Sequence, residues 1–510
     1  MKRSQSRTAA GNGRVVASGV SRRELIAAGG AMAAAATSSP LIANTASAQG
    51  SAGADATLDR LRRAAGDSGR RILIRGGTVI SMDAGVGDFA AGDVLIEGKR
   101  ISAVGPDLAG AGQGGNAIVV DAAGMVVIPG MIDCHRHSWE GQLHGIIPNS
   151  ASIADYMGAT HRGFAPFYQP EDMYVGNLTT ALGCIDAGIT CFIDNSHNSR
   201  SAAHSDAAIK ALFDSGIRAV HASGAPTFGE WDRQWPGDIA RLQRQYFSSD
   251  DQLVTLRIFS LGLAKNDWQL AQRLGLWVSV DGAGAPNGAQ MLQDFKKDGL
   301  LNERRAVNHG TGLTQESWLL LRDAGISVNA CPRSDAQWAL GTEAMGLQQA
   351  LNYGIRPGLS VDNGTAYSID LFGEMHAALV LQRWAAHGAS KRGEAVPPRL
   401  AVRDMLEFAT VRGAQNAALA HKIGTLTPGK EADIVLIRGG DINTLPLTNA
   451  VATVVSYAHA GNVDTVFIAG MPRKWAGKLV DVDLAAVRER VQRSRDRLFA
   501  RRGMKVEVVG

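Results

Sequence analysis

Cysteine is scarce in this chain, with four residues among 510. Cys134 stands beside a histidine pair, Cys184 and Cys191 lie close together in sequence, and Cys331 stands alone. These positions match no cysteine spacing typical of zinc sites, and a disulfide between Cys184 and Cys191 stays open. The four cysteines therefore predict neither a zinc cluster nor a disulfide framework of their own.

Clustered positive charge and long apolar runs are also missing beyond the first 48 residues. Without a stripe of lysine and arginine, the chain lacks what is needed to hold phosphate backbones, so we expect no nucleic-acid partner. No stretch after residue 48 is apolar for long enough to cross a bilayer, so we expect no membrane association of the mature form. Sixty glycines against seven tyrosines indicate many tight turns between alternating elements.

The first 48 residues have the features of a twin-arginine export signal. Arg22 and Arg23 precede a mild apolar run at residues 27 to 36, and residues 46 to 48 form a small-residue cleavage site. A membrane anchor is the alternative, but this run is short and rich in alanine and glycine. Removal of the signal changes the formal net charge from +4 to about −1. We therefore expect an exported protein, periplasmic or extracellular.

The rest of the chain divides by its pattern into a barrel and a small satellite. Short alternating segments with turn residues predict strands at residues 71 to 125 and again at 426 to 475, which we expect to form one small β-sandwich from both ends of the mature chain. Residues 49 to 70 form a polar leader, and residues 476 to 510 a C-terminal helix and tail.

Between the two flanks, residues 126 to 425 alternate strand-like and amphipathic helical runs. Eight such units predict a TIM (β/α)8 barrel. A doubly wound open sheet is the alternative, but no glycine-rich phosphate loop follows any strand. The first expected strand covers residues 125 to 133, and the other seven cover residues 191 to 194, 218 to 221, 254 to 259, 277 to 281, 306 to 309, 328 to 331 and 358 to 362.

His135 and His137 follow the first expected strand directly. Alternate residues of a strand point the same way, so the two imidazoles can face one metal ion without distortion of the backbone. Catalytic groups of such barrels stand at the carboxyl ends of strands. His197, Asp281, His309 and Asp362 also fall at predicted strand ends. These side chains are therefore expected to converge on one site.

Five motifs in order resemble the amidohydrolase superfamily, specifically its cytosine deaminase and atrazine/triazine hydrolase branch. The resemblance covers nearly the whole mature chain. The motifs are Ile128-Pro-Gly-Met-Ile-Asp-Cys-His-Arg-His137, Ala306-Val-Asn-His-Gly-Thr-Gly-Leu-Thr314, Val328-Asn-Ala-Cys-Pro-Arg-Ser334, Leu359-Ser-Val-Asp362 and Gly424-Thr-Leu-Thr-Pro-Gly-Lys-Glu-Ala-Asp-Ile-Val435.

The resemblance implies one divalent metal ion, zinc first, with iron or manganese as alternatives. His135 and His137 match the family's first histidine pair, Asp362 matches its strand 8 aspartate, and His309 matches its strand 6 histidine. Where the family's strand 5 usually has a histidine followed three residues later by a glutamate, this sequence has Asp281 and Gly284. Asp281 remains a competent ligand, a substrate contact or the remnant of a lost site.

These residues predict the chemistry of a hydrolase. A divalent ion lowers the pKa of a bound water toward neutrality, which supplies a metal-bound hydroxide. Asp362 can take the proton of that water and pass it to the leaving group, and His309 can stabilise the leaving group or a developing oxyanion. We therefore expect hydrolysis of a C–N bond, or an activated C–Cl bond, of a small, cyclic compound.

Two other functions stay open. Gly284 favours a non-hydrolytic lyase, decarboxylase or isomerase on the same barrel. The second alternative is a degenerate barrel that binds a small molecule without turnover. The presence of His135, His137, His309 and Asp362 together argues against it, because a site without catalysis has no physical need for these four side chains. The oligomeric state also stays open, although a homo-oligomer is common among soluble enzymes.

Substrate contacts are expected in the loops that follow the strands. An aromatic substrate could stack on side chains there, although packing of the loops themselves explains these residues equally well. The His197 run could also serve as a turn or cap. Asp370 and Glu374 are expected to cap and face the last barrel helix. The proposed substrate-binding residues are His197, Trp139, His144 and Trp338.

Overall fold

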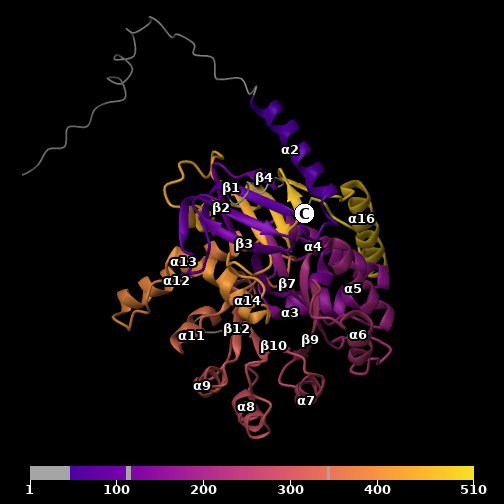
Figure 1. Ribbon diagram of the computed structural model, residues 1–510. Coiled ribbons are helices and arrows are strands. Elements are labelled where there is room, and N and C mark those ends of the chain that lie inside the picture. Colours follow the sequence, from indigo (N-terminus) through magenta and orange to yellow (C-terminus); the bar gives the residue numbers. More distant parts are fainter. Residues whose placement is uncertain (1–45, 109, 111–116, 342–344, 510) are drawn as a thin grey trace, which may run out of the picture. The chain divides into compact units, whose positions relative to one another are not determined.

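The computed structural model describes residues 46–108, 110, 117–341 and 345–509 (Figure 1). The chain divides into two compact units, Met1–Gly53 and Ala54–Gly510, and the architecture below is that of the second. The predicted export signal lies outside the described residues except for its last three positions, which begin helix α2 (Ala46–Arg63).

Eight parallel strands form the barrel in chain order, each hydrogen-bonded to the next. A parallel bridge between Arg136 and Asp362 joins the first strand to the segment after the last, which nearly closes the ring. Most of the strand residues are buried because helices cover the outer face and side chains fill the interior. The predicted TIM barrel is confirmed. Its strands are β6 (Met131–Arg136), β7 (Ile189–Ser196), β8 (Arg218–Ser223), β9 (Val254–Leu261), β10 (Val278–Asp281), β11 (Arg305–Asn308), β12 (Ser327–Ala330) and β13 (Gly358–Leu359).

Helices follow the barrel strands, and some of them begin at a residue whose side chain accepts a hydrogen bond from a free backbone N–H group. Thr314 accepts a hydrogen bond from Ser317 N at 3.2 Å, and Asp370 accepts one from Gly373 N at 2.7 Å, as predicted for the last barrel helix. The helices of this region are η2 (Ser138–Glu140), α3 (Ile153–Tyr156), η3 (Met157–Phe164), η4 (Ala165–Phe167), α4 (Pro170–Asp186), α5 (Ala202–Ser215), α6 (Asp238–Tyr246), α7 (Lys265–Leu274), α8 (Gly288–Lys297), α9 (Gln315–Asp323), α10 (Pro332–Gln337), α11 (Gly346–Asn352), α12 (Leu371–Arg392), α13 (Val402–Glu407), η5 (Phe408–Arg412) and α14 (Gly413–Asn416).

A separate mixed sheet is built from both ends of the chain, as predicted. Figure 1 shows the indigo strands of its beginning beside the orange and yellow strands of its end. They join where β5 pairs antiparallel with β14, with Val435 opposite Ile128. The path is β17-β16-β15-β14-β5-β1-β2-β3, and β4 pairs with β1. Its strands are β1 (Arg71–Ile80), β2 (Asp88–Glu97), β3 (Arg100–Gly105), β4 (Ile118–Asp121), β5 (Met125–Pro129), β14 (Ile434–Arg438), β15 (Val463–Ile468), β16 (Met471–Trp475) and β17 (Lys478–Leu479), with α15 (Ala450–Ser456) and η6 (Ala460–Asn462) between β14 and β15.

The boundary between the two parts lies at Gly130, slightly later than predicted. The sequence indicated one barrel strand over residues 125 to 133, whereas β5 belongs to the mixed sheet and β6 to the barrel. A Cβ atom on Gly130 would lie 2.0 Å from Oγ1 of Thr190. The glycine therefore permits the close approach at which the chain passes from one sheet to the other.

The predicted C-terminal helix is α16 (Leu484–Arg501), and it packs on α4 beside the barrel (Figure 1). The buried carboxylate of Asp172 accepts a hydrogen bond from Ser494 Oγ at 2.6 Å and one from Arg497. Leu498 is fully buried in the same contact. The helix therefore belongs to the barrel's outer layer.

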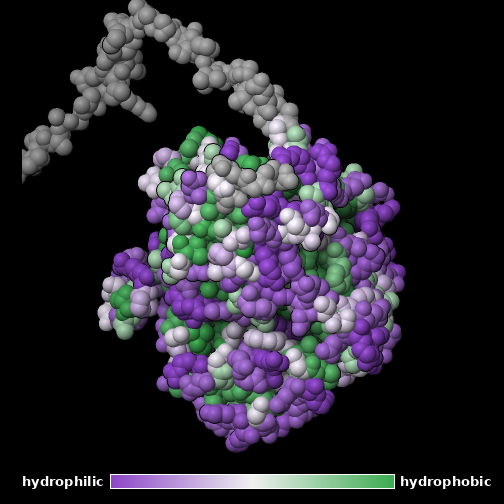
Figure 2. All heavy atoms as spheres, in the orientation of Figure 1, coloured by the Kyte–Doolittle hydropathy of each residue, from purple (hydrophilic) through white to green (hydrophobic). Residues whose placement is uncertain are grey.

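Cys134, Cys184, Cys191 and Cys331 are buried free thiols, so the disulfide left open by the sequence is absent. Within the described ranges, no helix combines the length and apolar character needed to span a bilayer. The face shown in Figure 2 is mainly hydrophilic, with smaller apolar areas between.

Candidate functional site

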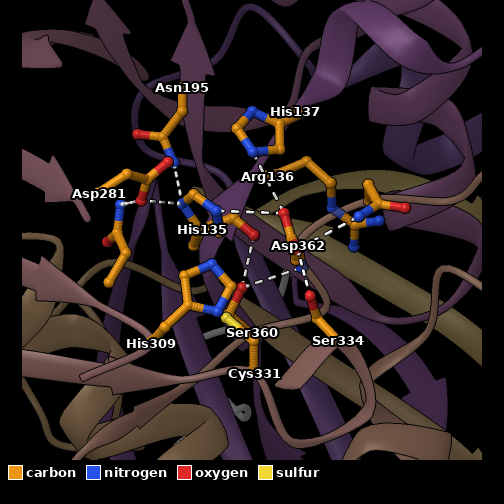
Figure 3. A network of polar contacts seen from close by, with 12 residues as sticks. His135, Arg136, His137, Asn195, Asp281, His309, Cys331, Ser334, Ser360 and Asp362 are labelled. Carbon is orange, nitrogen blue, oxygen red and sulfur yellow. Dashed lines mark hydrogen bonds and ion pairs between the residues drawn. The ribbon is translucent and has the colours of Figure 1, made fainter. Parts of the chain in front are cut away.

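His135 and His137 meet Asp362 at the carboxyl end of the barrel (Figure 3). Nε2 of His135 and Nε2 of His137 each lie 3.2 Å from Oδ1 of Asp362. Backbone hydrogen bonds fix this arrangement, because Asp362 N donates to His135 O at 3.0 Å and His137 N donates to Asp362 O at 2.9 Å. The first and last barrel segments therefore bring the predicted ligands together.

These donor atoms fit a divalent cation. His135 Nε2 and Asp362 Oδ1 are buried without a hydrogen-bond partner, although buried polar atoms are normally paired. Two imidazole nitrogens and one carboxylate oxygen form a common donor set for a catalytic zinc ion, which keeps a further position open. A cation among the three residues would satisfy both unpaired atoms.

Asp281 lies on the other edge of the His135 ring. Its Oδ1 is 3.8 Å from His135 Nδ1 and accepts a hydrogen bond from Asn308 Nδ2 at 2.6 Å. Asp281 and His309 form a second cluster of potential ligands around His135. The structure thus brings Asp281 to the site, opposite the nitrogen that faces Asp362.

Further side chains hold the ligands in place. Nδ1 of His137 lies 2.9 Å from Nε2 of His197, and the amide of Asn195 contacts Nδ1 of His135. The hydroxyl of Ser334 donates to Oδ2 of Asp362. Metal-binding imidazoles and carboxylates generally need such outer contacts to fix their orientation.

Both burial and neighbouring charges shift the pKa values of these groups. Burial opposes the charged form of Asp362, but the adjacent imidazoles of His135 and His137 hold the pKa of this carboxyl well below its usual value. Burial also opposes the charged form of His137, whereas its contact with Asp362 raises its pKa to about 9. Burial and the charge on His137 lower the pKa of His197 well below its ordinary value. A neutral His197 can accept the Nδ1 proton of His137.

His309 follows β11 with a left-handed backbone, at a φ of 63°. Nδ1 of its ring lies 2.9 Å from Oδ1 of Asp335, and the ring meets that of His135 at a centroid distance of 5.1 Å. Burial lowers the pKa of His309, but Cys331 and Asp335 outweigh this effect and raise it well above its ordinary value. His309 is therefore held at the site by a buried carboxylate.

A cavity of about 340 Å³ opens beside these residues, and its surface is mainly apolar. Among the described residues that line it there is no lysine or arginine. The cavity can therefore enclose a small neutral ring. Its lining includes Ile153, Tyr156, Met157, Phe259, Leu261 and Leu340, together with His137, His161, His197, Thr227, Asp281, Gly282, Asn308, His309, Thr311 and Asp362.

The predicted substrate contacts divide into two groups. His197 lines the cavity. Trp139 and Trp338 lie behind its wall: both are almost fully buried, and Trp338 stacks on Tyr156 at a ring distance of 5.3 Å. His144 lines a different cavity, near Tyr367 and Asp370. The structure does not bring these three side chains to the cavity surface beside Asp362.

Several groups at the site were missed by the sequence reasoning. His161 stacks on His197 at 4.9 Å with nearly parallel rings. Buried Glu140 accepts a hydrogen bond from Tyr156 OH at 2.8 Å. Both lie in the irregular helical segments after β6, where no strand end marks them. Asp335 directly follows a motif used for the resemblance, and its position after β12 was the available signal.

Gly284, the position at which a glutamate was expected, is tightly covered by backbone. A Cβ atom there would lie 2.2 Å from the carbonyl oxygen of Thr311 and 2.7 Å from the carbonyl carbon of Gly312. Any side chain at this position would require the loop after β11 to move. The cavity therefore receives no carboxylate from residue 284.

Residues 126–473 match the amidohydrolase family. A 5-methylthioadenosine/S-adenosylhomocysteine deaminase of Desulforudis audaxviator is 26% identical over 440 residues, which cover 84% of this chain and 99% of that protein. A 5'-deoxyadenosine deaminase of Methanosarcina mazei is 25% identical over 453 residues, again covering 84% and 99%.

Solved structures share the fold. An adenosine deaminase from Xanthomonas campestris with bound zinc superposes with a TM-score of 0.72 at 22% identity, covering 84% of this chain and 98% of that one. A variant of an atrazine chlorohydrolase from Arthrobacter aurescens, complexed with zinc and atraton, gives a TM-score of 0.72 at 21% identity, covering 83% and 100%.

Proposed function

This chain belongs to the amidohydrolase family, and on that premise we propose that it hydrolyses a carbon–nitrogen bond of a small, neutral ring compound. The observation that carries the proposal is the convergence of His135, His137 and Asp362 beside a mainly apolar cavity. The relatives that are deaminases of adenosine derivatives support this reaction class.

The protein side of the mechanism follows from the contacts of each residue. A divalent ion held by His135, His137 and Asp362, with zinc as the first candidate, would supply Lewis acidity and make water more acidic. Asp362 takes a proton from the attacking water and delivers it to the leaving nitrogen. His309 contacts the departing group. The C–N bond breaks, water's oxygen stays on carbon, and the nitrogen leaves as ammonia or an amine.

The cavity supports a preference among ring compounds. Because no lysine or arginine lines its described part, a carboxylate or phosphate on the substrate would be buried without a counter-charge. A neutral deoxynucleoside or an aminated triazine fits this lining better. A ring with an activated C–Cl bond fits the same cavity and would be attacked at the same carbon.

We also propose that the protein is exported by the twin-arginine route to the periplasm or beyond. The support comes from Arg22, Arg23, the short apolar run and the small-residue cleavage site. Replacement of both arginines by lysine should retain a fused reporter in the cytoplasm. Export of the substituted fusion by the same route would contradict this proposal.

The first test of the proposed function is the metal content of the purified chain, measured by plasma mass spectrometry after loosely bound ions are removed. We expect about one tightly held divalent ion per chain. The loaded protein is then assayed for ammonia release from 5'-deoxyadenosine, 5-methylthioadenosine and aminated triazines. An ion without any release from these compounds would contradict the proposed reaction, and absence of the ion would contradict the proposed centre.

A non-hydrolytic reaction on the same barrel is the second candidate, and the covered position of Gly284 favours it. The two candidates differ in the fate of water. In water labelled with ¹⁸O, hydrolysis places the label in the ring product, whereas elimination or decarboxylation does not.

A further inference from the structure

We infer that Asp335 is the positioning residue of this site, which holds the His309 ring so that Nε2 faces the substrate. This inference rests on the proposed function, because it assigns the group that prepares His309 for contact with the departing nitrogen. The conclusion comes from four features of the described residues: a direct contact, a shared helical turn, a clamped backbone and the absence of another free carboxylate.

The contact joins two buried side chains. Oδ1 of Asp335 lies 2.9 Å from Nδ1 of His309, and the side chains of Asp335 and His309 are 3% and 13% exposed. Oδ2 of Asp335 is buried without a partner. A carboxylate in this position accepts the Nδ1 proton, which leaves Nε2 as the ring atom available to the cavity.

The first turn of α10 supports two functional groups at once. Ser334 donates to Oδ2 of Asp362, and its neighbour Asp335 binds His309. The turn itself is fixed because Asp335 N donates to Cys331 O at 2.8 Å. Two consecutive side chains therefore set the relative placement of Asp362 and His309.

Because the backbone at His309 is held in place, rotation of the ring is the main freedom left to this side chain. His309 and Gly310 both have left-handed φ values, 63° and 69°. A Cβ atom on Gly346 would lie 1.7 Å from the carbonyl oxygen of His309, so the two backbones are in close contact. With the backbone held, the direction of the ring depends on the partner of Nδ1.

The other nearby carboxylates have different partners. Asp362 faces His135 and His137, and Asp281 accepts from Asn308. Residue 284 is a glycine covered by the backbone of residues 311 and 312. Among the described carboxylates of the site, Asp335 is therefore the one in place to orient His309. Figure 3 shows the His309 ring directed toward His135, on the side of the site occupied by Asp281.

The kinetic test compares Asp335→Ala with Asp335→Asn in the metal-loaded protein, using ammonia release from 5'-deoxyadenosine. An asparagine oxygen can still accept the Nδ1 proton, whereas alanine cannot. We expect the alanine variant to lose on the order of 10²-fold in kcat, with KM changed by less than about threefold. The asparagine variant should recover most of this loss. Equal kcat for Asp335→Ala and the parent would overturn the inference.

The matched control is Asp267→Ala. Asp267 is another partly buried carboxylate, hydrogen-bonded to Ser260 Oγ at 2.9 Å, and it does not line the cavity. Its substitution should leave kcat unchanged. An equal loss of kcat in this control would show that removal of any buried carboxylate disturbs the barrel, and it would overturn the specific role of Asp335.

A second measurement separates this inference from the proposed function. In the zinc-loaded protein with ¹⁵N-labelled histidine, the His309 ring signal is identified by its loss in His309→Gln. We expect Nδ1 to carry a proton in the parent and in Asp335→Asn, and to lose this fixed state in Asp335→Ala. An unprotonated Nδ1 in the parent would overturn the inference. If no compound is turned over, the proposed function fails, and the ring signal still decides the role of Asp335.

Discussion

Asp362 has more roles at the site than any other side chain described. It faces two imidazole nitrogens, accepts from Ser334 and accepts from Asn363 Nδ2 at 3.2 Å. Asp362→Asn keeps the shape and removes the charge. We expect kcat to fall by about 10²- to 10⁴-fold, with a matching loss of bound metal. Full activity and one ion per chain in this variant would refute both roles.

The role of Asp281 as a fourth metal ligand can be tested separately. Its carboxylate lies at the Nδ1 edge of His135, away from Asp362. If it binds the ion, Asp281→Ala should lower metal content and activity together. Asp281→His tests whether a histidine, the residue usual at this position in the family, binds the metal in this chain. Unchanged metal content and activity in Asp281→Ala would show that Asp281 is not a ligand.

Glu140 predicts a pH dependence of stability. Burial raises its pKa from 4.5 to about 8, so the folded chain binds a proton that the unfolded chain releases. Stability therefore falls as pH rises from about 4.5 to about 8. Glu140→Gln mimics the protonated form and removes this loss. In urea unfolding of the metal-free protein, the variant should gain stability over the parent between about pH 5 and about pH 8.5. A pH-independent difference would contradict the assignment.

At the scale of elements, α16 can be tested through one buried side chain. Leu498 is fully buried with Trp139 and Phe164. Leu498→Ala should cost about 2–5 kcal/mol of unfolding free energy, because the cavity left behind closes only in part. Thermal unfolding measures the loss. Arg493→Ala, which removes an exposed pair with Glu489, should change little. Equal Tm values for both variants would show that the helix adds no stability.

The helices and strands also show where a sequence pattern is sufficient to locate an element. The runs that became β7 to β13 were recognised because buried parallel strands are continuously apolar. The division at Gly130 was missed because apolar residues stand on both sides of it, at the end of β5 and at the start of β6. His309 was expected in a strand, but the strand ends at Asn308 and His309 turns into a left-handed conformation.

For the whole molecule, removal of the metal is the informative perturbation. An ion that binds the folded chain alone stabilises it by about 2.7 kcal/mol at a free concentration 100 times its Kd. Dialysis against a chelator should therefore lower both Tm and activity, and zinc should restore both. The His135→Ala variant serves as the control, since chelation should not shift its Tm. An unchanged Tm of the parent after chelation would contradict a metal that links the first and last barrel segments.

The order of strands, the two-part sheet from both chain ends and the histidine pair with Asp362 were all determined by the sequence itself. These features depend on local patterns: apolar runs, alternate residues on one strand, and motifs in a given order. The partner of His309, the position of Asp281 on the opposite edge of His135, the stacked His161 and the covered Gly284 were decided by the tertiary structure alone. Each depends on contacts between residues far apart in the chain, or on how closely two backbones approach. A local sequence pattern carries no information on either.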